Sequence, residues 1–141
     1  MKYKVASLEL VLIGHATEDP EVLAKLINRV LPDSVKGRVR IERRVMKGYY
    51  GNQITMYTVK LSGDEASEAL SYILSRMEDS SKKLLKATAD LRIQKPSTIH
   101  LRLHKQFLTE DRFVLWDGDD VVKVKVRFKS SRELKKMLDE I

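Results

Sequence analysis

The chain has no cysteine among its 141 residues. Disulfide bonds, thiolate zinc sites and cysteine nucleophiles are therefore excluded. The longest aliphatic run covers residues 10–13, far short of the roughly 20 residues that a membrane-spanning helix needs. The residues before the first apolar stretch also lack the small-residue cleavage site of a secretory signal. We therefore expect a cytoplasmic protein with no membrane partner.

Side chains that carry catalysis or bind metals are also scarce. The three histidines are His15, His100 and His104, and none has a carboxylate or second histidine at the spacing of a helical metal site. On a strand, the last two would lie roughly 13 Å apart. The chain has no glycine-rich phosphate loop and no nucleophile elbow, and the acidic residues at 117–120 lack the other ligands of a calcium loop. We expect no enzyme, no catalytic residue, no metal site and no cofactor.

Positive charge is in excess. Lysine and arginine number 27 against 20 acids, which gives a net charge of +7. Such an excess favours polyanionic partners, with the phosphate backbone of RNA as the first candidate. A length of 141 residues with 43% hydrophobic content fits one soluble globular domain over residues 1–141.

Periodicity and turn residues predict the order of elements. Helix caps at Asp19 and Ser62, the second with Glu65 three residues later, open the first two long helices. A further helix should use Leu84, Leu85 and Leu91 as its apolar residues, with one long bent helix as the alternative, and a short helix covers about residues 131–141. Strands are expected at residues 5–13, 38–45, 54–61 and 98–104 and from residue 121. The order favours an α+β fold, a single two-layer domain with helices packed on one face of a mostly antiparallel sheet.

The closing strand alternates apolar and cationic residues. Because successive side chains on a strand point to opposite faces, Val122, Val124, Val126 and Phe128 should enter the core. The opposite face of that strand then carries Lys123, Lys125, Arg127 and Lys129.

Other cations are expected on the same open face of the sheet. They are Arg38, Arg40, Arg44 and Arg102. A basic sheet face with nearby aromatic side chains, here Tyr49 and Tyr50 of a hairpin loop, is typical of RNA-binding domains. Two alternatives stay open: acids such as Glu9 and Glu42 neutralise the cations across strands, and the tyrosines only pack on a sheet edge.

Three segments together resemble a known family. They are residues 13–19 (IGHATED), 48–54 (GYYGNQI) and 101–106 (LRLHKQ). Their order and spacing are similar to those of archaeal RNA-binding proteins described as predicted exosome subunits, over about residues 5–129. In that family a HATED loop enters the first helix, a G-[HY]-Y-G-N-P-I loop joins two strands, and LRLDKQ ends a later strand. Gln53 replaces the usual proline, and His104 replaces the usual aspartate.

The resemblance implies RNA binding and a fold similar to a large-subunit ribosomal protein that binds the small ribosomal RNA. It also implies a link to the exosome or to ribosome-related proteins. The motif residues carried over by position are His15, Thr17, Glu18 and Asp19, then Tyr50, Gly51 and Asn52, then Arg102, Lys105 and Gln106.

The leading hypothesis is a non-catalytic RNA-binding protein. The expected RNA-binding residues are Arg38, Arg40, Arg44, Tyr49, Tyr50, Asn52, Arg102, Lys105, Gln106, Lys123, Lys125 and Arg127. The alternative is a protein-interaction adaptor of an RNA-processing assembly without direct RNA binding. Its motivating feature is an apolar patch expected from Leu134, Leu138 and Ile141 on the C-terminal helix.

Overall fold

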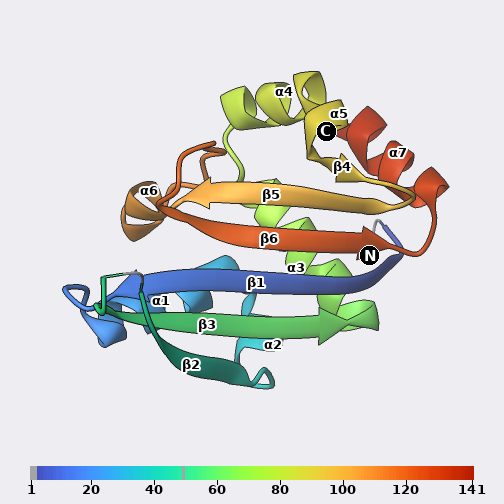
Figure 1. The fold of residues 1–141 in the computed structure, drawn as a ribbon. Coiled ribbons are helices and arrows are strands. Elements are labelled where there is room, and N and C mark those ends of the chain that lie inside the picture. The colour runs from blue at the N-terminus through green and yellow to red at the C-terminus, as the bar shows by residue number, and fades with distance from the viewer. Residues whose placement is uncertain (1–2, 49) are drawn as a thin grey trace.

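Six strands form one antiparallel sheet in the order β2-β3-β1-β6-β5-β4 (Figure 1). The computed structural model describes residues 3–48 and 50–141. The strands are β1 (Val5–His15), β2 (Ile41–Lys47), β3 (Gln53–Ser62), β4 (Ile93–Gln94), β5 (Thr98–His104) and β6 (Val121–Phe128). All neighbouring strands pair antiparallel.

Helices cover one face of this sheet and leave the other open. The helices are α1 (Pro20–Val30), α2 (Asp33–Lys36), α3 (Gly63–Arg76), α4 (Asp79–Ala87), α5 (Ala89–Arg92), α6 (Lys105–Thr109) and α7 (Ser131–Glu140). In Figure 1, α1, α2 and α3 lie behind the sheet, α4, α5 and α7 gather beyond β5 and β4, and no helix of the described chain lies in front. The predicted α+β domain with helices on one face is confirmed.

The core lies between the covered face of the sheet and these helices. On the central strand β1, Leu8, Leu10 and Leu12 are at most 1% exposed. On β6, every second residue from Val122 to Phe128 is buried and the residues between are exposed. The predicted two faces of the closing strand are therefore confirmed.

The two predicted helix caps had different outcomes. The Asp19 carboxylate accepts a hydrogen bond from the Glu21 amide at 2.9 Å, and Pro20 opens α1. Ser62 lies at the N-cap of α3 as predicted, but its side chain makes no capping hydrogen bond, so the predicted capping box does not form. The chain instead enters α3 through Gly63 with φ of 56°, a conformation that residues with a Cβ rarely adopt.

The second strand begins three residues later than expected. It covers Ile41–Lys47, and Arg38 lies before it. The Arg38 Nε donates to the carbonyl of Ser34 at 3.0 Å and lies 3.9 Å from a carboxylate oxygen of Glu65 in α3. The prediction that Arg38 is an outward strand residue is therefore wrong, because local and helix partners draw it to the covered side.

The C-terminal helix does not present the expected apolar patch. The Ser130 hydroxyl caps it by accepting from the Glu133 amide at 3.3 Å. Leu134 is buried, and Leu138 and Ile141 pack partly buried against the core. The feature that motivated the adaptor hypothesis is thus absent from α7. Of the three leucines expected as apolar residues of the helix after α3, Leu85 is buried as expected, whereas Leu84 and Leu91 are 38% and 86% exposed.

Core packing gives a stability prediction. Leu101 is 0% exposed at the centre of β5. We expect Leu101→Ala to lower the free energy of unfolding by about 2–5 kcal/mol, because it removes buried methyl groups and leaves a cavity. Urea denaturation measures this. Leu91→Ala, on an exposed leucine, should change the same quantity by no more than about 0.5 kcal/mol, and an equal loss in both variants would contradict the assigned burial.

Candidate nucleic-acid interface

The register of the strands places outward side chains in rows across the open face. In one row Arg102 of β5 pairs with Lys123 of β6, Lys123 with Val11 of β1, and Val11 with Thr58 of β3. Paired residues share a face of the sheet. Cationic side chains of β5 and β6 therefore lie beside an apolar centre on β1.

A second row carries more charge. His100 pairs with Lys125, Lys125 with Glu9, and Glu9 with Lys60. Lys60 is exposed on β3 and extends the cationic surface past the centre of the sheet. We call the outward residues of β1, β2, β3, β5 and β6 the open face.

The cations of the open face are not neutralised by the acids between them. Among residues 3–48 and 50–141, Lys60, Lys123 and Lys125 have no carboxylate oxygen within 4.0 Å. Glu9 lies between two of these lysines in register, yet it forms no ion pair within that limit. The alternative of a neutralised face, in which Glu9 and Glu42 pair with the cations, is not what the described structure contains.

The pKa of His100 is affected by the positive charge of the open face. Its pKa is lowered by burial first and by the charge of Lys125 second. The imidazole is therefore neutral at pH 7, and one of its nitrogens lies 3.1 Å from Oε1 of Gln94. His100 adds hydrogen-bonding capacity to the open face, but not charge at neutral pH.

The open face is hollowed rather than flat. A depression of about 590 Å³ lies among Arg40, Arg44, Met56 and Lys60, with Glu9 at its side. Two smaller ones, of about 310 and 330 Å³, run over β1, β5 and β6. The expected outward positions of Arg40 and Arg44 are confirmed, and both arginines line the depression of about 590 Å³.

Arg102 holds the turn that precedes β6. Its Nη2 donates to the carbonyl of Gly118 at 2.6 Å and lies 3.8 Å from Oδ1 of Asp119. Its Nε is buried and has no hydrogen-bond partner among the described residues. Arg102 therefore lies on the open face as expected, with part of its donor capacity already used.

Lys105 has a structural role in this fold. Its side chain is 5% exposed, and its ammonium lies 2.8 Å from Glu18, 3.1 Å from Asp120 and 3.0 Å from the carbonyl of Ile13. These oxygens occupy the three donors of a lysine. Lys105 joins the loop after β1 to the turn before β6. Its neighbour Gln106 is exposed and within 3.5 Å of the Thr109 hydroxyl.

The hairpin loop between β2 and β3 extends the open face at one end. Its turn closes through the Gly48 amide, which donates to the carbonyl of Asn52 at 2.6 Å, and Gly51 has φ of 78°. Tyr50 is 91% exposed, and Asn52 is exposed as well. The expected base contact of Tyr49 lies outside the described residues.

Sequence reasoning missed two residues of the open face, Lys60 and Trp116. Lys60 could have been found, because it alternates with the buried Val59 and Leu61. Trp116 lies in a segment without regular strand structure. An isolated β-bridge between Leu115 and Leu103 determines on which face of the sheet the Trp116 side chain lies. No sequence period signals that placement.

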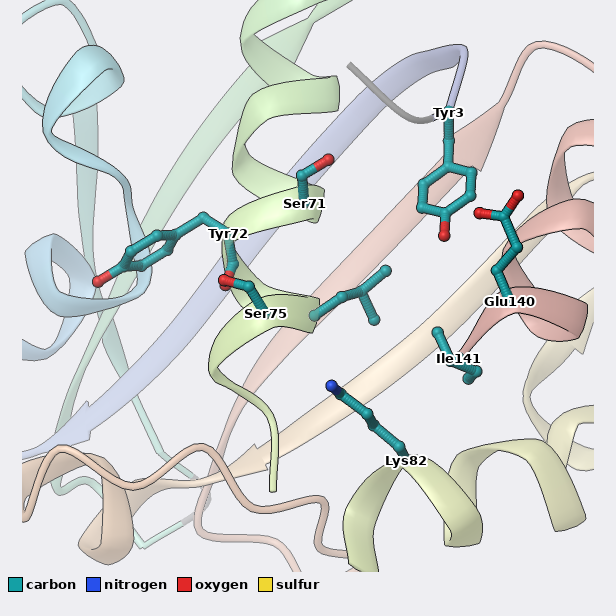
Figure 2. A pocket seen from close by; sticks show the side chains of 8 residues that line it. Tyr3, Ser71, Tyr72, Ser75, Lys82, Glu140 and Ile141 are labelled. Atoms are coloured by element: carbon teal, nitrogen blue, oxygen red, sulfur yellow. The ribbon is translucent and has the colours of Figure 1, made fainter. Parts of the chain in front are cut away.

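A separate cavity of about 660 Å³ lies on the covered side, between α3, α4 and α7 (Figure 2). Figure 2 shows Lys82 directed into it and Glu140 beside Tyr3. Burial first, then a hydrogen bond with Glu140 and the charge of that carboxylate, raise the pKa of Tyr3 to about 12. Its lining combines one lysine and one acid with serine, tyrosine and aliphatic side chains.

In the described part of the chain, no group of three or more histidine, cysteine, aspartate or glutamate side chains is placed to hold a metal ion. None of the helices described is both long and apolar enough to cross a bilayer.

Comparison with known proteins gives a consistent result. A family model described as RNA binding matches residues 7–128. An uncharacterized protein of Methanocaldococcus jannaschii is 30% identical over 127 residues, which cover 87% of this chain and 84% of that protein. A protein named as an RNA-binding protein of Pyrococcus abyssi is 24% identical over 118 residues, covering 82% of this chain and 77% of that one.

Solved structures share the fold. A Sulfolobus solfataricus protein assigned to the DUF54 family superposes with a TM-score of 0.80 at 26% identity, covering 95% of this chain and 98% of that one. An Archaeglobus fulgidus protein of the same assignment gives a TM-score of 0.76 at 23% identity, covering 97% and 99%. At 23% identity, the similarity to the Archaeglobus fulgidus protein supports the fold alone.

The buried Lys105 and the exposed Lys123 should differ in their contribution to stability. Lys105→Met should lower the free energy of unfolding by roughly 2 kcal/mol, because charged hydrogen bonds to two acids and a carbonyl are lost. Lys123→Met should leave the free energy of unfolding within about 0.5 kcal/mol of that of the parent, because its side chain is exposed and forms no ion pair among the described residues. Thermal or urea unfolding of both variants measures the difference, and equal stabilities would show that Lys105 is not a structural group.

Proposed function

Because this chain belongs to the RNA-binding family, we propose that its open face is the surface that binds RNA, without catalysing a reaction. One observation carries the proposal: Lys60, Lys123 and Lys125 lie on one uncovered sheet face, and none of them forms an ion pair among the described residues. A buried or paired cation serves folding, whereas an exposed and unpaired one keeps its attraction for phosphate.

Phosphates would be held by exposed cations on both sides of the sheet centre. These are Arg40, Arg44, Lys60, Lys123, Lys125 and Arg127. Arg102 contributes at the margin, and Tyr50, Asn52 and Gln106 contact sugars or bases at the ends of the strands. Tyr49 keeps its place in the proposal on sequence grounds. Lys105 does not, because its three donors bond within the fold. Arg38 does not, because it lies before β2, beside Ser34 and Glu65.

The arrangement separates affinity from specificity. Lysines and arginines on strands attract any phosphate backbone, whereas sequence choice requires contacts with bases. An association with the exosome or with ribosome-related proteins, a likeness to a large-subunit ribosomal protein and a cytoplasmic location remain predictions of the family resemblance.

Salt dependence tests the phosphate contacts. Each phosphate contact contributes roughly 0.7 to 0.9 to the slope of log affinity against log salt concentration. The double variant Lys123→Gln/Lys125→Gln should therefore lower the magnitude of that slope by about 1.4 to 1.8. Fluorescence anisotropy of a labelled RNA hairpin across a salt series measures the slope.

A matched control removes two charges from the covered side. Lys25 on α1 and Lys135 on α7 are exposed, and both helices pack against the core. Lys25→Gln/Lys135→Gln should leave the slope close to that of the parent protein. Absence of RNA binding by the parent at low salt, or an equal fall in both double variants, would refute the proposed surface.

A further inference from the structure

The single tryptophan of the chain lies at the margin of the open face. The Trp116 amide donates to the carbonyl of Arg102 at 2.9 Å, and the amide of His104 donates to the carbonyl of Val114 at 2.8 Å. These bonds flank the antiparallel bridge between Leu103 and Leu115. Both leucines are buried. Trp116, the next residue along the strand, therefore points to the opposite, open face.

This placement extends the first row of outward residues by one position. Trp116 is opposite Arg102, and Arg102 is opposite Lys123. Neighbouring strands lie about 4.8 Å apart, so the backbone of Trp116 is about 10 Å from that of Lys123. An aromatic ring, a guanidinium and an ammonium thus follow one another across the edge of the sheet.

The indole is exposed and held in place at the same time. Trp116 is 49% exposed, although tryptophan is usually highly buried. The His104 ring packs on it edge to face, with ring centroids 5.1 Å apart. On the other side the indole lies over Gly118, where a Cβ would come within 2.3 Å of its Nε1. A ring fixed in this way loses little conformational entropy when a ligand stacks on it.

We propose that Trp116 is a base-stacking residue, and that the preferred RNA carries an unpaired nucleotide where it meets the margin of the sheet beside β5. This inference rests on the proposed function of the open face. The base stacks on the indole, and Lys123 with Arg102 holds the adjoining phosphate. In a continuous duplex both faces of each internal base are stacked on neighbours, so only unpaired bases have a face free for an aromatic side chain.

The tryptophan itself supplies the measurement. The chain has one tryptophan beside five tyrosines, so emission excited at wavelengths that tyrosine does not absorb reports on position 116 alone. A single-stranded oligoadenylate should quench this emission on binding. The same strand annealed to oligouridylate should bind, by anisotropy of a labelled strand, with far less quenching.

Variants test the energetic contribution. Trp116→Ala should weaken binding of the single strand about 5- to 150-fold, the equivalent of one lost base stack. Its affinity for the duplex should stay within about twofold of that of the parent protein. Trp116→Phe keeps an aromatic face and should retain most of the affinity. Val22→Ala, on an apolar residue of α1 that is 44% exposed, serves as the matched control and should change neither affinity.

The outcomes separate the two proposals. If RNA binds the parent protein but leaves the emission unchanged, and Trp116→Ala binds the single strand as the parent does, base stacking is overturned while the open face stands. Equal losses for single strand and duplex in Trp116→Ala would also overturn it. If neither RNA binds the parent protein at low salt, the proposed function itself fails.

Discussion

Every residue of β6 serves one of two environments, because successive side chains of a strand point to opposite faces of the sheet. The helices occupy one of those faces, so Val122, Val124 and Val126 must be apolar. The other face meets water along the whole width of the sheet. On β6, Lys123, Lys125 and Arg127 are exposed on that face, whereas Val121 at the start of the strand is buried. Stability and anion binding are thus carried by alternate residues of the same strand.

Antiparallel pairing spreads this division over the sheet. The register that places Leu10 beside Val124 in the core also places Glu9 beside Lys125 on the open face. A shift of one residue would exchange the two faces and bury the cations. The packing of the core fixes the strand register, and the strand register fixes the positions of the cations on the open face.

The cations fall into two groups that composition cannot tell apart. Lys105 is buried among oxygens from three segments of the chain, and Arg102 supports the turn before β6. Lys123 and Lys125 are exposed and have no acid partner in the described part of the chain. The first group keeps the ends of β1, β5 and β6 together. Lys123 and Lys125 provide the attraction for phosphate. Their positions are fixed because Lys105 and Arg102 hold the ends of the strands together.

The sequence predicted what depends on local periodicity. The bounds of β5 were predicted as residues 98–104, which is where the strand lies, and the two faces of β6 were predicted correctly. What failed depends on residues distant in the chain or on irregular backbone. The carbonyl of Ile13 that binds Lys105 is 92 residues away. Arg38 donates a hydrogen bond to Ser34 and lies beside the carboxylate of Glu65. The side of the sheet on which Trp116 lies depends on the single β-bridge of its neighbour Leu115.

The central claim is that RNA binds the uncovered side of the sheet. Nuclear magnetic resonance titration of the isotope-labelled protein with an RNA hairpin tests it residue by residue. The account predicts that the perturbed amide signals belong to β1, β3, β5 and β6 and to the segment around Trp116, while those of the outer surfaces of α1 and α7 stay in place. Perturbations confined to the helices, with the signals of β6 unchanged, would contradict it.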